Sequence, residues 1–135
     1  MIAAVCGWHE NHESALAAIS TRLERGEQLL VASHALLEMY AVLTRLPAPH
    51  RLSSKDAVIL IRSNFVDGVK AVSLTATDYR KLIMQAPTKG FAGGRAYDAL
   101  IVECARKARV STILTFNFGD FANLVPKNIE AVIPG

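Results

Sequence analysis

Three oxygen-bearing side chains stand late in the sequence and have the chemistry of a divalent-metal site. Asp98 opens a stretch whose apolar residues have helical spacing, while Asn117 and Asp120 follow a short β-prone run. Clustered carboxylates raise one another's pKa unless a cation neutralises them. Hard oxygen donors favour Mg²⁺ or Mn²⁺, which keep several waters and meet substrate phosphates directly. Because such a cation can activate water and stabilise charge on a phosphodiester, these residues indicate phosphodiester chemistry.

The lengths of the flanking elements predict that these side chains meet. A helix over Asp98–Ala108 rises about 16 Å at the usual rise per residue. A strand over Ser111–Thr115 climbs back about 16 Å. The chain therefore returns to the level at which it started, and we expect Asp98 beside Asn117 and Asp120.

A third acid, Glu38, comes soon after the expected strand Leu29–Ala32. Sites in open α/β sheets form beyond the carboxyl ends of the strands, which places Glu38 on the same rim. Its neighbours are apolar, so its carboxylate needs a partner to offset desolvation. That partner is either a metal ion or an arginine, Arg45 or Arg95. These two arginines and Lys89 are also the cations that we expect to hold a nucleic-acid backbone.

The order of elements predicts an α/β fold. Apolar periodicity, caps and turn residues predict helix, strand, helix, helix, strand, helix, helix, strand, strand. Strands separated by helices imply right-handed crossovers and a parallel, doubly wound sheet in a single domain, residues 1–135. Besides those named above, three helices are expected: one from Asn11 or His12 that Gly26 stops, one from Ser33 or His34 that ends before Pro47, and one from Ser53 or Ser54 to about Phe65. A fourth helix opens at Thr77, its candidate N-cap, runs through Ile83 or Gln85 and is ended by Pro87. The other expected elements are a strand Val69–Leu74, a polar loop after Thr115, and a strand Ile129–Ile133.

Composition limits the class of protein without naming its partner. The chain has 135 residues, half of them apolar, and a net charge of +3 that permits a nucleic-acid partner without requiring one. No apolar run reaches the roughly 20 residues of a membrane span, and the start does not resemble a secretory signal. Cys6 and Cys104 lack the spacing of a metal or disulfide framework, so we expect reduced thiols and a cytoplasmic location.

The remaining chemically capable residues give weaker signals. His9 and His12 are not followed by a third ligand at zinc-like spacing, and there is no phosphate-binding P-loop or nucleophile elbow. Cys104 lies in an apolar helical stretch and is predicted to be core. Trp8 is predicted to pack under the first long helix, with stacking on a nucleobase as the alternative.

Three segments resemble the motifs of PIN-domain proteins, and more narrowly those of VapC-type toxins. His34–Pro47 resembles the second acidic motif, Tyr97–Ile101 the third, and Thr115–Phe121 the fourth. Each motif alone is weak, but three in order are fairly specific, and the resemblance runs through essentially the whole chain. It implies a three-layer α/β/α fold with a parallel central sheet.

The resemblance also implies a function and roles for individual residues. The implied activity is Mg²⁺-dependent (or Mn²⁺-dependent) endoribonuclease cleavage. Glu38 and Asp98 would carry over as metal-binding acids, Asn117 holds the variable position of the fourth motif, and Asp120 is a second candidate there. Thr115 would carry over as the hydroxyl that orients the acids. The implied partners are an RNA substrate, a VapB-like antitoxin that covers the site, and a second copy of the chain.

One part of the family pattern is missing from the sequence. PIN domains begin with a strand ending in an acid that is a principal metal ligand, whereas Met1–Val5 resembles the residues just downstream of it. We therefore expect the N-terminal central strand and the first catalytic Asp to be absent, and neither Glu10 nor Glu13 is placed to substitute. Three explanations for the missing strand compete. The start codon is assigned too late, the chain is a decayed toxin, or Met1–Val5 itself forms a stub of the strand. An in-frame stop codon directly before Met1 would exclude the first.

Two rival functions use the same residues. A degenerate, non-catalytic PIN domain would still bind antitoxin or RNA, and the missing first acid is its best support. A small α/β phosphatase or receiver-like domain ranks last, because it would need a nucleophilic acid at the end of a first strand.

Overall fold

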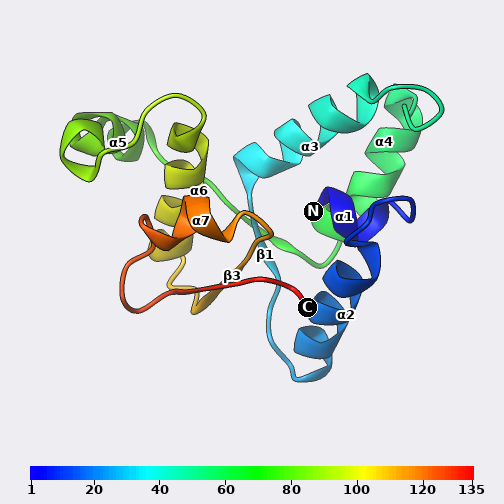
Figure 1. Cartoon of the computed structure of the whole chain (residues 1–135). Coiled ribbons are helices and arrows are strands. Elements are labelled where there is room, and N and C mark those ends of the chain that lie inside the picture. The colour runs from blue at the N-terminus through cyan, green and yellow to red at the C-terminus, as the bar shows by residue number, and fades with distance from the viewer. The chain divides into compact units, whose positions relative to one another are not determined.

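The computed structural model describes residues 1–135, which divide into two compact units. Unit 1 comprises residues 1–71 with Gly135, and unit 2 comprises residues 72–134. Figure 1 labels their α-helices and the strands β1 and β3. No helix of the chain combines the length and apolarity that crossing a membrane would require.

Unit 1 is mostly helical. Capping explains where two of its helices end or begin: Gly26 adopts a positive φ of 80° just after α2, as a helix stop requires, and Ser53 Oγ accepts a hydrogen bond from the Asp56 N–H at 3.1 Å at the start of α4. β1 pairs with β2 where the unit ends. The elements are α1 (Ile2–Val5), α2 (His12–Glu24), β1 (Leu30–Ala32), α3 (Ser33–Arg45), α4 (Ser54–Ile61), the π-helical turn η1 (Arg62–Val66) and β2 (Lys70–Val72).

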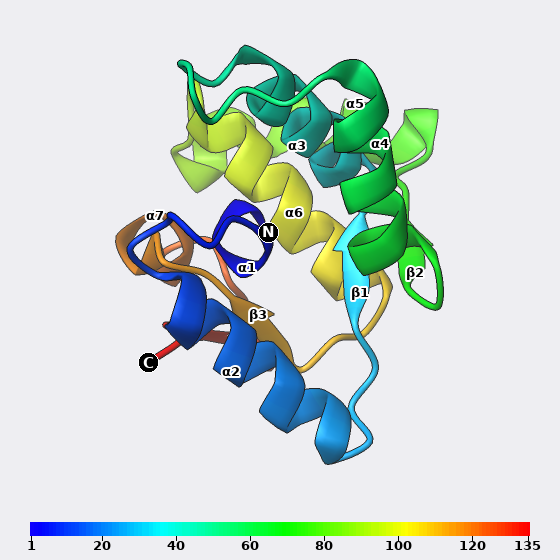
Figure 2. The same cartoon turned by 90° about the vertical axis from the view of Figure 1, so that its right-hand side faces the viewer.

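Part of the core of unit 1 lies where α3 contacts α4, two consecutive helices that are neighbours in Figures 1 and 2. Leu43 of α3 is fully buried, with 0% of its surface exposed. Its main-chain carbonyl accepts a hydrogen bond from the Leu52 N–H at 3.0 Å, which ties the connector before α4 back onto α3. The other buried apolar side chains of these elements are Met39, Ala57, Ile61 and Phe65.

Unit 2 places a parallel strand pair beside three helices. β3 pairs with β4 in parallel, with Ile113 opposite Ala131, and α7 lies in the connection between them. α6 contacts both α5 and α7, and its buried face carries Leu100, Cys104 and Ala105 as the helical spacing predicted. The elements are α5 (Ala76–Lys89), α6 (Arg95–Lys107), β3 (Thr112–Leu114), α7 (Phe118–Ala122) and β4 (Glu130–Val132).

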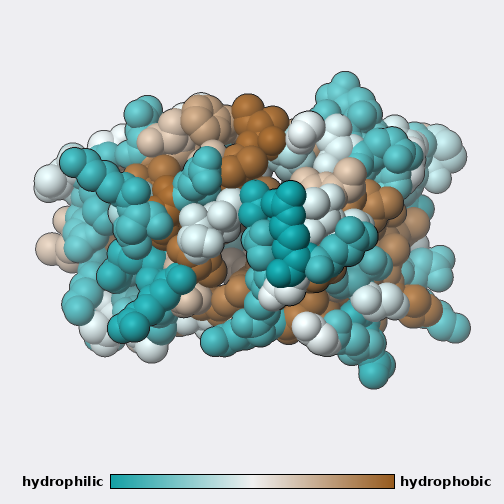
Figure 3. All heavy atoms as spheres, turned by 90° about the horizontal axis from the view of Figure 1, so that it is seen from below, coloured by the Kyte–Doolittle hydropathy of each residue, from teal (hydrophilic) through white to brown (hydrophobic).

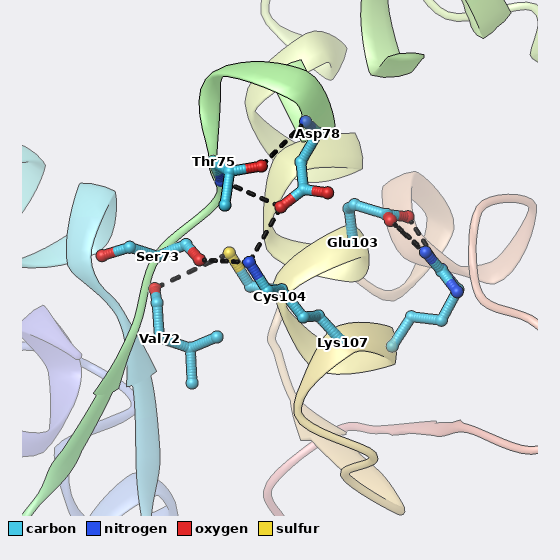
Figure 4. A network of polar contacts seen from close by, with 8 residues as sticks. Val72, Ser73, Thr75, Asp78, Glu103, Cys104 and Lys107 are labelled. Carbon is cyan, nitrogen blue, oxygen red and sulfur yellow. Dashed lines mark hydrogen bonds and ion pairs between the residues drawn. The ribbon is translucent and has the colours of Figure 1, made fainter. Parts of the chain in front are cut away.

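A polar network fastens the end of α6 to the start of α5 (Figure 4). Lys107 Nζ donates to Asp78 Oδ2 at 2.8 Å and to the Ser73 carbonyl at 3.2 Å. Thr75 and Asp78 form a capping box, in which each side chain accepts from the other's main-chain N–H. Beneath them the Cys104 thiol is within 3.8 Å of the Val72 carbonyl. Burial raises the pKa of that thiol, which fits the predicted core role of Cys104.

Acid is expected to loosen this network. The hydrogen bond from Lys107, followed by those from Thr75, holds the pKa of Asp78 well below its usual range. A carboxyl whose pKa is lower in the folded state stabilises the fold above its unfolded pKa of about 3.9. That stability is lost as the pH falls below this value toward the folded pKa. We expect the urea midpoint to drop more steeply below about pH 4 in the natural chain than in Asp78→Asn. Parallel pH profiles for the two proteins would contradict this.

The strands form two separate pairs, β1–β2 and β3–β4, so the expected single parallel sheet is not confirmed. Each strand has only three residues, and no strand pairs with both β1 and β3. Met1–Val5 does not supply a stub of such a strand. Ile2–Val5 forms the helical turn α1, closed by a hydrogen bond from the Cys6 N–H to the Ile2 carbonyl at 3.1 Å.

Three further local predictions were wrong. The cap of α5 is Thr75 rather than Thr77, because Asp78 lies three residues after Thr75 and completes the capping box. Pro87 lies inside α5, which ends at Lys89 and is capped by Gly90 in the left-handed conformation with φ 72°. The segment after Thr115, predicted to be a polar loop, contains the short helix α7.

Trp8 is not packed away under α2 as predicted. Its side chain lies in the turn between α1 and α2 and keeps 47% of its surface exposed. The indole stacks on the His50 ring, with ring centroids 4.3 Å apart and planes inclined by 28°. Apolar residues also reach the surface elsewhere, as the brown areas of Figure 3 show.

Candidate functional site

Two of the predicted acids lie on neighbouring helices of unit 2. Asp98 is half-buried in the first turn of α6, and Asp120 is exposed in the first turn of α7. The two helices contact each other, and Arg95 Nη2 donates to the Asp120 carbonyl at 3.2 Å. The prediction that the start of the helix and the segment after the strand converge is therefore confirmed for these elements. First turns of helices favour acidic residues, and both acids hold such a position.

The loop between β3 and α7 is shaped by Thr115. Its main-chain N–H donates to the Val132 carbonyl at 3.0 Å, which extends the β3–β4 pairing by one residue. Its Oγ1 accepts from the Asn117 N–H at 3.0 Å, the hydrogen bond of a threonine turn. Asn117 occupies the N-cap position of α7, and its side chain is exposed. Thr115 thus positions the segment that carries Asn117 and Asp120.

Arg95 makes one hydrogen bond to α7 and has one buried donor without a partner. It begins α6, and its Nη2 is held by the Asp120 carbonyl. Its Nε is buried and has no hydrogen-bond partner. A buried donor without a partner is costly, so a bound water or anion there would remove a penalty. Lys89 and Arg45, the other predicted cations, lie exposed in the last turns of α5 and α3.

Glu38 lies in unit 1 and is more exposed than its apolar neighbours suggested. Its side chain on α3 is 54% exposed, and its carboxylate lies 3.6 Å from His34 Nε2. Within unit 1, the partner of Glu38 is thus His34, which the sequence analysis did not predict. His34 is four residues earlier, a spacing that brings side chains together on a helix and could have revealed the pair from the sequence. His34 does not cap α3, since Ala32 holds that position.

The donors suit a hard divalent cation, but their number within either unit is small. Carboxylate and amide oxygens are the ligands that Mg²⁺ and Mn²⁺ prefer. Unit 2 brings the elements of Asp98, Asn117 and Asp120 together, whereas unit 1 offers Glu38 with His34. Neither unit gathers three histidine, cysteine, aspartate or glutamate side chains close enough to hold one ion.

Comparison with known proteins identifies the family. Residues 1–124 match the PIN domain. The chain belongs to the PIN-domain family. It is 36% identical over 110 residues to Ribonuclease VapC40 of Mycobacterium tuberculosis, which covers 80% of this chain and 75% of that protein, in strains CDC 1551 and H37Rv alike. It is 33% identical over 107 residues to Ribonuclease VapC27 of strain H37Rv, covering 79% of this chain and 65% of that relative. This PIN domain is of the VapC type.

Proposed function

We propose that this PIN domain is the ribonuclease toxin of a VapBC-like toxin–antitoxin pair and cleaves RNA phosphodiester bonds with the help of Mg²⁺ or Mn²⁺. The observation that carries the proposal is the meeting of α6 and α7, which presents Asp98 and Asp120 from adjacent helix starts beside Arg95. The similarity to two ribonucleases supports the reaction class. Because the family match runs through both units, we propose that they act as one domain in the cytoplasm.

Each predicted site residue has a proposed role. Asp98 and Asp120 hold the cation through their carboxylates, and Glu38 is a further metal-binding acid by its place in the second family motif. Asn117 adds an amide oxygen, and Thr115 orients the segment that carries it. When bound, the cation would lower the pKa of a water molecule and stabilise charge on the phosphate.

The basic residues have a separate role in binding the substrate. Arg95, Lys89 and Arg45 are proposed to contact phosphates of the RNA, because cations supply most of the sequence-independent affinity for nucleic acid. The hydrogen bond from Arg95 Nη2 to the Asp120 carbonyl and the buried Nε without a partner support this role for Arg95. Binding through these side chains should weaken steeply as salt is added.

The test is cleavage of single-stranded RNA by the purified chain. With Mg²⁺ or Mn²⁺ we expect fragments to accumulate, and with EDTA we expect none. Calorimetric titration of Mg²⁺ provides a second readout that does not depend on turnover, and Asp98→Ala and Asp120→Ala should each weaken the binding. If the chain binds no divalent cation and RNA stays intact in both conditions, the ribonuclease proposal fails.

A non-catalytic PIN domain is the alternative, and one observation favours it. Neither unit by itself gathers three histidine, cysteine, aspartate or glutamate side chains, and Glu38 already has a partner in His34. This alternative predicts that the chain binds antitoxin or RNA while calorimetry detects no binding of Mg²⁺ or Mn²⁺. Metal binding that Asp98→Ala abolishes would exclude it.

An apolar groove between α3 and α4 supports an antitoxin partner. It has a volume of about 460 Å³ and lies wholly within unit 1. Leu37, 70% exposed, borders it and directly precedes Glu38, so an amphipathic helix seated there would also cover this acid. The apolar side chains that line the groove are Leu36, Leu37, Tyr40, Val58, Ile61 and Val66.

Placing a charge in this groove is expected to abolish antitoxin binding. Leu37→Asp would bury an unpaired carboxylate under the partner, which costs several kcal/mol. We expect co-expressed VapB-like antitoxin to be retained by the natural chain on an affinity column and to be lost from Leu37→Asp. Leu23→Asp is the matched control, because Leu23 is an exposed leucine, 51%, on α2 of the same unit and does not line the groove. Equal retention by both variants would place the antitoxin elsewhere.

A homodimer is the last partner that we propose. The exposed apolar side chains Ile83 and Met84 on α5 support it, because burying them between two copies would remove apolar surface from water. Light scattering during gel filtration should give twice the mass of the chain. The substitution Met84→Glu should shift that mass to the monomer.

A further inference from the structure

An open depression in unit 1 has the features of a nucleobase site. It has a volume of about 500 Å³ and is bordered by the turn after α1, by the connector before α4, and by α4 with η1. We propose that it binds an unpaired RNA base carrying an exocyclic amino group, stacked on Trp8. This inference rests on the proposed function in taking RNA as the ligand, and it adds a base-binding site built from residues with no assigned role.

Trp8 provides the stacking surface. The side chain lines the depression and is held in place by its stack on His50, yet 47% of its surface stays exposed. Leaving so much apolar area in water has a free-energy cost that a core position would avoid. Proteins that bind single-stranded nucleic acid use exposed aromatic rings of this kind as platforms for bases. A ring already fixed by His50 loses little conformational freedom when a base stacks on it.

The polar side chains around Trp8 present hydrogen-bond acceptors. The Ser63 hydroxyl donates to the Ile59 carbonyl at 2.9 Å, and Asn64 Nδ2 donates to the Leu60 carbonyl at 2.8 Å. The Ser63 hydroxyl and one of the two N–H groups of the Asn64 amide are therefore directed to the helix backbone, and the side-chain oxygens of both residues remain as acceptors. Asp56, exposed in the first turn of α4, adds a carboxylate to the lining. Acceptors match the amino groups of adenine, cytosine and guanine, which uracil lacks.

Charges beside the depression favour RNA over a cationic peptide. An arginine side chain from a protein could also stack on Trp8 and pair with Asp56. However, Arg51 and Lys55 are both exposed and are sequence neighbours of lining residues. Arg51 Nε donates to the Leu46 carbonyl at 2.9 Å, which anchors this cation at the connector. Two cations would repel an arginine-rich segment but would attract the phosphates on either side of a bound base.

The chain reports on this site directly, because Trp8 is its only tryptophan. Titrating the full-length protein with 2′-O-methyl oligocytidine in EDTA should quench its fluorescence, because a stacked base contacts the indole. Oligouridine of the same length should quench it much less, since uracil offers no amino group to the acceptors. An abasic oligomer with the same phosphates should leave the fluorescence unchanged. Neither cleavage nor metal enters this measurement, so an inactive ribonuclease would still give the quenching.

Substitutions at Trp8 then test whether the affinity for RNA depends on the indole ring. Trp8→Ala should weaken binding of fluorescein-labelled oligocytidine by about 5- to 150-fold, the range of one lost base stack. Trp8→Phe keeps an aromatic face and should stay within about threefold of the natural chain. Tyr79→Ala, which removes an exposed aromatic ring from α5 of unit 2, is the matched control and should change nothing. Far-UV circular dichroism verifies that each variant is folded.

Several outcomes would overturn the proposal. If the abasic oligomer quenches the fluorescence as strongly as oligocytidine does, the protein contacts the phosphates of the RNA and not a base. Equal affinity for oligouridine and oligocytidine would remove the role of the acceptors. Quenching by an arginine-rich peptide but not by RNA would assign the depression to a protein partner. A titration with no quenching at all would show that no base reaches Trp8.

Discussion

Replacing Asp98 by alanine is expected to lower the rate of RNA cleavage at least about 100-fold. The reason is that the proposed site has few carboxylates, so each contributes a large share of the charge that holds the cation. Loss even of groups that only support a metal ligand costs about 10- to 100-fold, and loss of a ligand should cost more. The measurement is the initial rate of cleavage of one labelled RNA at saturating Mg²⁺. Raising the Mg²⁺ concentration should restore part of the activity if the variant has lost affinity for the cation.

Glu130→Ala is the matched control for this substitution. Glu130 is an exposed acid of the same unit, but it lies on β4 and is not among the proposed ligands. Its loss should leave the rate within about twofold, because isolated surface charges contribute little. If Asp98→Ala and Glu130→Ala have equal rates, Asp98 is not a ligand, and the non-catalytic alternative becomes the better account.

Leu43→Ala is expected to lower the free energy of unfolding by about 2–5 kcal/mol. Leu43 is the only large side chain with no measurable exposure, and it lies where α3 packs on α4. Truncation there removes apolar contacts and leaves a cavity that rigid helices fill only partly. A domain of this size has about 5–15 kcal/mol in total, so a large part of the molecules should unfold at moderate urea.

Leu37→Ala serves as the comparison, because it makes the same chemical change on the same helix at a side chain that is 70% exposed. Its effect should stay within about 0.5 kcal/mol. Urea unfolding monitored by circular dichroism measures both variants. Equal losses of stability would show that α3 does not bury Leu43 in the way described.

The helices were predictable wherever the sequence carries their local signals. The C-termini of α2 and α3 follow from Gly26 and Pro47, and the start of α4 follows from its cap Ser53. These residues act through backbone conformation and capping alone. The start of α5 was also encoded, but two threonines compete for the cap. Only the spacing of Thr75 from Asp78 decides between them.

Pairing of strands was beyond the reach of local signals. All four strands have three residues, and a short apolar segment does not specify its neighbour. The convergence of α6 and α7 could be predicted because it depends only on the rise of a helix and of a strand. The pairing of Glu38 with His34 was missed because burial was inferred from its apolar neighbours, although the side chain points outward.

The hydrogen bond from Arg95 to the Asp120 carbonyl has a practical consequence for work with a toxic protein. It joins α6 and α7 through a main-chain acceptor, so the bond does not depend on the carboxylate of either proposed acid. Alanine at Asp98 or Asp120 should therefore leave this junction in place while removing charge from it. Such inert variants should be harmless to an expression host and should still bind uncut RNA. They are the reagents with which the natural targets of this chain can be captured from cells and sequenced.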